Sequence, residues 1–314
     1  MPIYKNKKGK IMNFKNNIFL KSIVTSKSVI NYCSISLLVV STSTFALDVD
    51  PGDYAPLPDG SNLGLLYYKS VKRDSIYSDK HKVSSNSKLN TDVTILRAVH
   101  YKKVNDYLMN FQILLPAARF STGGDISGLG KETGIGDPIL ASTIFLNKDG
   151  TAHNSFGIAQ YLTLPVGSYR HKRDLNVGEN RWQYVLQAGY TGALTENVFY
   201  DLTGDVTLFG KNSKFTEQKL TLKQKPKYQL QTYLRYKTSD TSEIYAGYSQ
   251  HWKGETRVDK DWQRDVSNQQ KFMLGASYFL TNRTQILGTL GGDTAVDNGF
   301  KEKTSVSLRL LHVF

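Results

Sequence analysis

The sequence predicts an all-β fold, a transmembrane antiparallel β-barrel of about twelve strands with short periplasmic turns and long extracellular loops. Three observations lead to this prediction. Very short polar turns alternate with long polar loops, the segments between them alternate apolar and polar side chains over about ten residues each, and the chain ends on Phe314. Tight turns on one side and long loops on the other are the connectivity of a bacterial outer-membrane barrel.

The connections fall into two classes. Five short turns, expected on the periplasmic side, lie at 103–106, 147–150, 194–197, 238–241 and 281–284. Long stretches rich in Gly, Ser, Asn, Lys and Asp, expected to be extracellular, lie near 76–88, 117–132, 166–180, 209–226, 253–269 and 291–301. Because the two classes alternate, successive strands are expected to run antiparallel.

Twelve strands are expected between these connections, near 63–73, 90–101, 107–116, 135–146, 155–165, 181–193, 198–209, 227–237, 242–252, 270–280, 285–291 and 303–314. The middle strands have the clearest pattern. In 198–208 one face carries Val198, Tyr200 and Leu202, while the other carries Asp201, Thr203 and Asp205. A period of two with one apolar row is typical of a wall between lipid and water. The first two strands alternate poorly, so ten or fourteen strands also fit.

The N-terminal region is predicted to be an export signal. Residues 1–46 contain seven lysines and no acid, then an apolar stretch, and end with small residues at a cleavage site after Ala46. Met12 is an alternative start, and a membrane anchor is the alternative interpretation. The only cysteine, Cys33, lies in this region, so no disulfide is expected in the exported chain. Residues 47–62 are predicted to be a periplasmic segment too short for a plug, and 63–314 the barrel.

Composition by itself points to a soluble protein, since the mean hydropathy is −0.38. Barrel strands escape this test, because each crosses the membrane in about ten residues and only alternate side chains face lipid. The net charge is +13, and removing the seven lysines of residues 1–46 leaves the rest near +6. Basic residues in the long loops suggest contact with outer-membrane lipids and with the phosphates of lipopolysaccharide. No nucleic-acid-binding motif accompanies them.

The last strand has a second diagnostic pattern. Val306, Leu308, Leu310 and Phe314 share one face, and a terminal aromatic residue with apolar residues at alternate positions resembles the assembly signal of outer-membrane barrels. The barrel assembly machinery is therefore an expected partner of the Phe314 strand. His312 departs from the pattern, since it stands where an apolar residue is commoner.

Several short motifs, in this order and spacing, carry a resemblance that covers residues 51–314: 52–60 (GDYAPLPDG), 134–138 (GIGDP), 164–169 (LPVGSY), 176–182 (NVGENRW) and 297–300 (DNGF). Together they resemble the putative MetA-pathway-of-phenol-degradation family. The resemblance implies an outer-membrane barrel commonly labelled a transporter and often associated with the catabolism of aromatic compounds. It implies no established catalytic residues.

Candidate functional residues follow from the alternation. Seven polar side chains are predicted to line the lumen, either as mutual struts or along a selective path: Asp201, Asp205, Tyr233, Arg235, Ser249, His251 and Arg309. Five residues of the motifs are predicted at the mouth, either pinning a loop across it or only closing the barrel: Asp137, Pro138, Glu179, Asn180 and Arg181.

The functional prediction is passive passage of small, hydrophobic or aromatic molecules through the outer membrane. One alternative is a structural barrel with a closed lumen. Another is a lipid hydrolase, because Ser249 and His251 are two residues apart on one strand face, as nucleophile and base must be. The six histidines are scattered without the spacing of a metal site, and no cofactor is expected.

Overall fold

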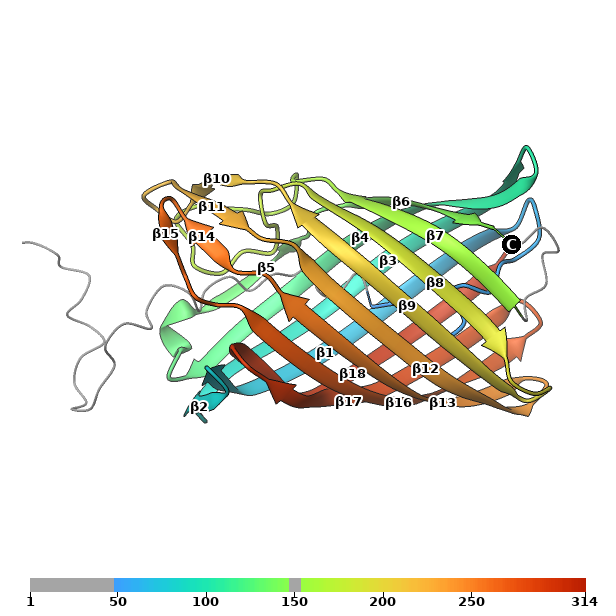
Figure 1. The fold of residues 1–314 in the computed structure, drawn as a ribbon. Coiled ribbons are helices and arrows are strands. Elements are labelled where there is room, and N and C mark those ends of the chain that lie inside the picture. The colour runs from blue at the N-terminus through green and yellow to red at the C-terminus, as the bar shows by residue number, and fades with distance from the viewer. Residues whose placement is uncertain (1–47, 147–153) are drawn as a thin grey trace, which may run out of the picture. The chain divides into compact units, whose positions relative to one another are not determined.

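A computed structural model describes residues 48–146 and 154–314. The signal sequence predicted for residues 1–46 and the turn predicted at 147–150 lie outside the described residues. Within the described residues one closed ring of antiparallel strands dominates (Figure 1). Its members, in ring order, are β1 (Asn62–Ser78), β3 (Ser87–Val104), β4 (Tyr107–Gly124), β6 (Ile139–Phe145), β7 (Asn154–Thr163), β8 (Gln183–Ala193), β9 (Val198–Phe209), β12 (Lys227–Ser239), β13 (Ser242–Lys253), β16 (Ser267–Thr281), β17 (Thr284–Val296) and β18 (Gly299–Val313).

The ring closes where β18 pairs with β1, from Leu63 opposite Val313 to Tyr77 opposite Gly299. The predicted β-barrel of twelve strands is thus confirmed, with strands longer than expected at the outer end. Smaller elements complete the chain: β2 (His81–Ser84), the 3-10 helix η3 (Ser127–Leu129), β5 (Lys131–Ile135), β10 (Asn212–Phe215), β11 (Leu220–Gln224), β14 (Thr256–Val258) and β15 (Asp261–Trp262). No helix in the described part is long and apolar enough to cross a membrane.

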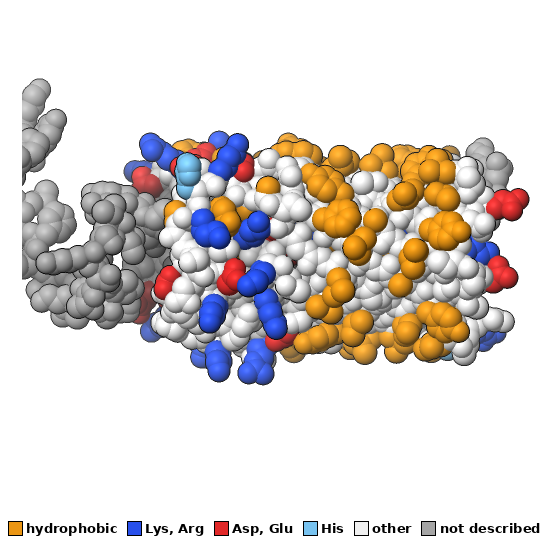
Figure 2. Space-filling model, turned by 90° about the horizontal axis from the view of Figure 1, so that it is seen from below, with side chains coloured by type: hydrophobic (Ala, Val, Ile, Leu, Met, Phe, Trp, Pro, Cys, Tyr) orange, Lys and Arg blue, Asp and Glu red, His pale blue; other side chains and the backbone are white. Residues whose placement is uncertain are grey.

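The walls follow the predicted alternation. On β9, Leu202 and Leu208 are 46% and 47% exposed on the outside, whereas Asp201 and Asp205 are 5% and 9% exposed on the inside. Apolar side chains form a band around the visible face, and Lys and Arg side chains gather beyond it, toward the end where β2 and β15 lie (Figure 2). This arrangement matches a lipid-facing belt below a water-facing rim.

The turns and loops agree less uniformly. Short turns stand where predicted at 103–106, 194–197, 238–241 and 281–284. The prediction of a long loop at 291–301 is wrong, because β17 continues to Val296 and β18 begins at Gly299. The loop predicted at 117–132 is mostly the paired strands β4 and β5. Those at 209–226 and 253–269 contain a four-stranded sheet, β10-β11-β14-β15. Beyond the membrane the outer face of a strand meets water instead of lipid, so the apolar outer row ends while backbone pairing continues.

One buried carboxylate attaches this outer sheet to the barrel. Asp265 accepts hydrogen bonds from the backbone N–H of Thr256 at 2.7 Å and from the Lys253 ammonium at 2.7 Å. Burial raises the pKa of Asp265, but the Lys253 charge and these hydrogen bonds outweigh it, so the pKa is lowered below its usual value. The carboxylate is therefore charged at neutral pH and holds the β14 hairpin against the end of β13.

Candidate functional site

The seven predicted lumen residues all point inward and are 1–9% exposed. Asp201 and Arg235 form an ion pair, with the guanidinium Nε 2.8 Å from a carboxylate oxygen, and Arg235 also meets Glu243 at 3.1 Å. Thr191 donates a further hydrogen bond to Asp201 at 2.6 Å. Charges on neighbouring strands therefore satisfy one another on this side of the lumen.

Of the segment predicted to be periplasmic at 47–62, residues 48–54 lie inside the barrel, whereas 58–60 are exposed beside the short turn that contains Lys103. Gln231 exchanges two hydrogen bonds with the backbone of Val49, at 2.9 and 3.2 Å, as an adjoining strand would. The N–H of Gly52 donates to Asp201 at 3.2 Å, and the hydroxyl of Tyr54 donates to Gln187 at 2.9 Å. The segment is short, yet its side chains reach strands on several sides of the lumen, so it fills the lumen without being a domain.

Charge complementarity explains why the segment enters. Three of its four acids meet basic side chains of the inner wall: Asp48 with Lys69 at 2.8 Å, Asp50 with Arg309 at 3.0 Å, and Asp53 with Arg97 at 3.0 Å and Arg309 at 3.1 Å. Taking charges out of water is costly unless an opposite charge meets them at short range. The segment supplies those partners, and Arg309, predicted as a lumen residue, is held by it.

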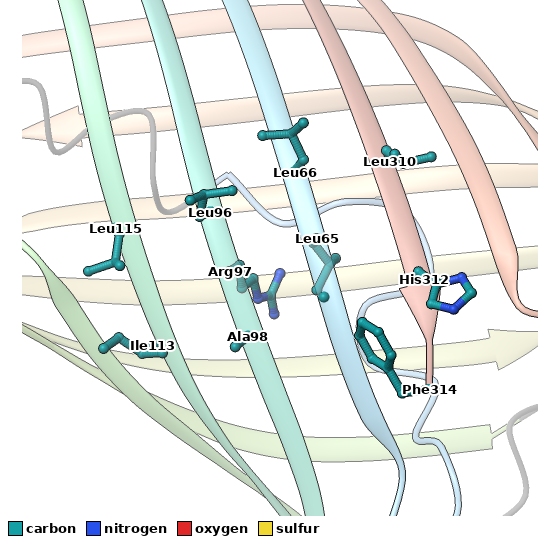
Figure 3. A pocket seen from close by; sticks show the side chains of 11 residues that line it. Leu65, Leu66, Leu96, Arg97, Ala98, Ile113, Leu115, Leu310, His312 and Phe314 are labelled. Atoms are coloured by element: carbon teal, nitrogen blue, oxygen red, sulfur yellow. The ribbon is translucent and has the colours of Figure 1, made fainter.

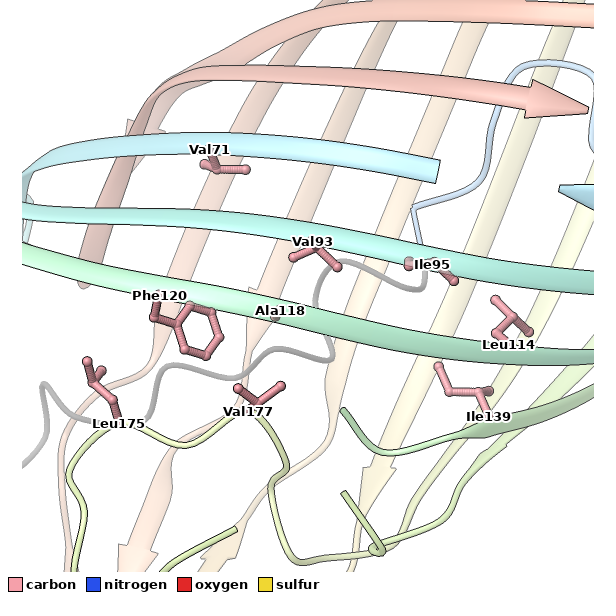
Figure 4. Packing of buried hydrophobic residues seen from close by; sticks show 9 residues of the cluster. All are labelled: Val71, Val93, Ile95, Leu114, Ala118, Phe120, Ile139, Leu175 and Val177. Carbon is pink, nitrogen blue, oxygen red and sulfur yellow. The ribbon is translucent and has the colours of Figure 1, made fainter. Parts of the chain in front are cut away.

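Another part of the inner wall is apolar. A cluster of buried hydrophobic side chains comes from β1, β3, β4 and β6 and from the loop between β7 and β8 (Figure 4): Val71, Val93, Ile95, Leu114, Ala118, Phe120, Ile139, Leu175 and Val177. Leu175 and Val177 belong to the loop, which is thus folded against the inner wall. Barrel interiors are generally polar. This lumen instead combines its charged side chains with a continuous apolar cluster, which the sequence analysis did not predict.

The five predicted rim residues come together. The carboxylate of Asp137 accepts hydrogen bonds from the backbone N–H groups of Gly167 at 2.8 Å and Glu179 at 2.7 Å. Pro138, at the break between β5 and β6, accepts one from Leu164 at 2.9 Å. The strand predicted over 135–146 is therefore interrupted at 136–138, and the loop is tied to the break.

A buried ion pair continues this rim. Arg181, 1% exposed, lies 2.6 Å from Glu179 and donates to Gln224 of β11 at 2.9 Å. Its guanidinium also stacks over the Phe209 ring at 4.4 Å. Asn180 donates to Asn212 of β10 at 2.9 Å. The rim residues thus join the break in the wall, the loop and the outer sheet.

Ser249 and His251 lie in contact, with Oγ and Nε2 3.4 Å apart. The other ring nitrogen, Nδ1 of His251, is buried and has no hydrogen-bond partner among the described residues. A catalytic base is normally oriented by a third group at that nitrogen. Nor do the described residues contain a group of His, Cys, Asp and Glu side chains that could hold a metal ion.

Sequence reasoning missed several charged residues of the lumen, notably Lys69, Arg97, Lys227, Lys271 and Glu302. Lys69 and Arg97 lie in the two strands with poor alternation, and Glu302 lies next to a falsely predicted loop. The three acids of 48–53 could have indicated these residues. An extended periplasmic linker does not need acids at these positions, whereas inward-facing Lys and Arg side chains of a barrel need acidic partners.

A closed twelve-stranded ring with an apolar outer belt and a charged interior defines a bacterial outer-membrane β-barrel. The sequence model of the family described as "Putative MetA-pathway of phenol degradation" matches residues 73–310, and the chain belongs to this family, which confirms the predicted resemblance. The crystal structure of the COG4313 outer membrane channel from Pseudomonas putida F1 is similar, with 37% identity, 85% of this chain and 100% of that chain covered, and a TM-score of 0.81.

A second solved structure shares only the fold. It is the β domain of the Bordetella autotransporter Brka, with 10% identity, 82% of this chain and 100% of that chain covered, and a TM-score of 0.53. No curated protein matches the chain. The family and the similar channel agree in placing this protein in the outer membrane as a channel.

Proposed function

We propose that this channel conducts small hydrophobic or aromatic molecules passively across the outer membrane. The observation that carries the proposal is the apolar inner wall built around Val71, Val93 and Phe120. A pore for hydrophilic solutes gains nothing from such a surface. An aromatic solute gains roughly 25 cal/mol for each Å² of apolar area removed from water. The N-terminal segment must yield for solute to pass.

The first test is uptake of labelled benzyl alcohol by cells that express the protein in an intact outer membrane. Expression is expected to raise uptake several-fold. The variant Val71→Thr with Val93→Thr keeps nearly the same volumes but makes the apolar wall polar, and it is expected to lose most of this gain. Small ionic currents in planar bilayers should stay unchanged in that variant.

The structural alternative predicts another result. A barrel with a permanently closed lumen would carry no current and would not alter uptake at all.

Lipid cleavage can be assayed on the same purified protein. We propose no catalytic role for Ser249, because nothing among the described residues orients His251, and detectable hydrolysis lost in Ser249→Ala would contradict this view.

We also propose that the outer sheet binds lipopolysaccharide. The ammonium of Lys225 and the guanidinium of Arg257 lie 4.3 and 5.3 Å from the centre of the exposed Trp262 ring. Lys223 is exposed beside Arg257, its partner in the register of β11 and β14, and Glu255 neutralises Lys225 only in part, at 3.1 Å. Phosphates favour such clusters of cations at the membrane surface.

Retention of lipopolysaccharide tests this surface. The variant with Lys223→Gln, Lys225→Gln and Arg257→Gln is expected to copurify with markedly less lipopolysaccharide, quantified by mass spectrometry. A control with Lys102→Gln, Lys103→Gln and Arg283→Gln removes the same charge at the periplasmic turns and should retain the wild-type amount. Equal retention in all three proteins would exclude the outer sheet as the binding surface.

Phe314 stays a predicted contact of the barrel assembly machinery. It is 72% exposed, its N–H donates to Asn62 at 2.9 Å, and its ring packs edge-on against His312 at 4.9 Å. Figure 3 shows it beside an open hollow of about 340 Å³ on the lipid-facing surface, where Gly64 and Ala98 leave room between leucines. Outer-membrane lipid is the expected occupant of this hollow, since it lies within the apolar belt.

A further inference from the structure

The carboxylate of Asp48 is bound inside the lumen as a small anion would be. One oxygen accepts a hydrogen bond from the Lys69 ammonium at 2.8 Å, and the other accepts one from the Gln229 amide at 3.2 Å. The Lys271 ammonium lies 4.0 Å away. These three groups come from β1, β12 and β16, so Asp48 is enclosed by the wall rather than held by its own segment.

The wall around Asp48 has one more cation than it has acids. Among the described residues its acids are Asp205, Asp293 and Glu302, and its cations are Lys69, Arg73, Lys227 and Lys271. Glu302 is already engaged, by Arg73 at 2.5 Å and by Lys271 at 2.6 Å. Asp48 therefore supplies the carboxylate that the wall lacks. If the segment withdraws, the wall is left with an unmatched positive charge in a poorly solvated place.

The side chain of Lys227 is available to bind a further polar group at this site. Its ammonium interacts electrostatically with Asp205 and Asp48, but it forms no hydrogen bond or ion pair with any described residue. Thr207 stands opposite Lys227 in the register, and its buried hydroxyl likewise has no partner there. Buried polar atoms are almost always satisfied in folded proteins, so the unpartnered Thr207 hydroxyl beside Lys227 indicates a place that receives a polar group.

The neighbourhood also accommodates an apolar body. Val71 follows Lys69 on the same inward row of β1 and begins the apolar wall. On β16, Met273 follows Lys271 in the same way and packs with Tyr233, Tyr245 and Leu287. A ligand whose carboxylate replaced that of Asp48 would thus have apolar surface on two sides.

We propose that the Asp48 site is a solute site for the carboxylate of a small aromatic or aliphatic acid, and that Asp48 occupies it as a built-in substitute until solute displaces it. This rests on the proposed channel function and narrows its solute class. The segment would then be released by the solutes that the lumen is built to bind.

Binding of benzoate and of its neutral isostere benzamide to the purified, folded protein tests the proposal by titration calorimetry. Asp48→Asn empties the site of its carboxylate and is expected to bind benzoate roughly tenfold more tightly than the wild type, the range expected for a hydrogen-bonded charge pair. Benzamide binding should hardly change. Adding Lys271→Gln and Lys227→Gln to Asp48→Asn should abolish the preference for benzoate.

The matched control is Asp50→Asn, which loosens the same segment at Arg309 but leaves Asp48 in place. It should not increase the preference for benzoate. Equal gains for benzoate and benzamide in Asp48→Asn, or an equal gain in Asp50→Asn, would overturn the proposal by showing mere loosening. Asp48→Ala gives an independent repeat should the amide itself fill the site. Because calorimetry needs no transport, a failure here is distinct from a failure of the benzyl alcohol uptake test.

Discussion

Replacing Gly189 by valine is expected to expel Tyr54 from the lumen and to raise the single-channel conductance several-fold. A Cβ atom at position 189 would lie 2.1 Å from the Tyr54 ring, far inside contact distance. Gly157, opposite Gly189 in the register of β7 and β8, completes a flat surface for that ring. Once the valine displaces the Tyr54 ring, the hydrogen bond from Tyr54 to Gln187 is lost, and the N-terminal segment no longer packs against this wall.

The matched control for this experiment is Gly204→Val on the neighbouring strand β9. Gly204 also lies in mid-strand, but a Cβ there would meet only atoms at 3.8 and 3.9 Å, an ordinary contact. Both variants should migrate as folded barrels before heating. If the Gly189 variant is folded yet conducts no better than wild type and the control, the segment is not what restricts current.

Replacing Glu179 by glutamine is expected to destabilise the barrel by about 3 kcal/mol, because the buried charge of Arg181 then loses the carboxylate that lies 2.6 Å away. The loss would appear as a lower urea midpoint for unfolding in lipid vesicles. The effect should begin at the outer rim, where the loop, the break at 136–138 and the outer sheet are joined.

The double variant Glu179→Gln with Arg181→Met separates charge from packing. Methionine removes the buried charge and keeps much of the side-chain volume, so part of the stability should return. If the double variant loses as much stability as Glu179→Gln and Arg181→Met measured separately lose together, the pair instead contributes through packing. Wild-type stability in Glu179→Gln alone would mean that water reaches Arg181.

The strands were predictable because the membrane constrains alternate side chains directly. Leu202 and Leu208 face lipid, whereas Asp201 and Asp205 face the lumen. Apolar and polar residues therefore alternate in the sequence wherever a strand crosses the membrane. At 291–301 lipid no longer constrains the outer face, although Asp293 and Val296 on the inner face are still buried. Glycine and polar residues there suggested a loop, whereas backbone pairing in fact carries β17 and β18 almost to their turn.

The inward placement of Asp201 and Arg235 could likewise be predicted, since they lie on the same face of adjacent strands. The contacts of such lumen residues with the N-terminal segment could not be predicted. Gly52 reaches Asp201 from 149 positions away, and Asp50 reaches Arg309 from 259 positions away. No local pattern encodes which strands of a ring will face a given segment across the lumen.

By itself the sequence determined the barrel, its lipid-facing rows and its family, because each depends on neighbours a few residues apart; it favoured twelve strands, and closure of β18 on β1 decided that number. Only the tertiary structure decided that the acids of 48–53 fill the lumen and that one inner wall is apolar. Both depend on closure of the ring, which brings distant strands into contact across a space that no short stretch of sequence describes.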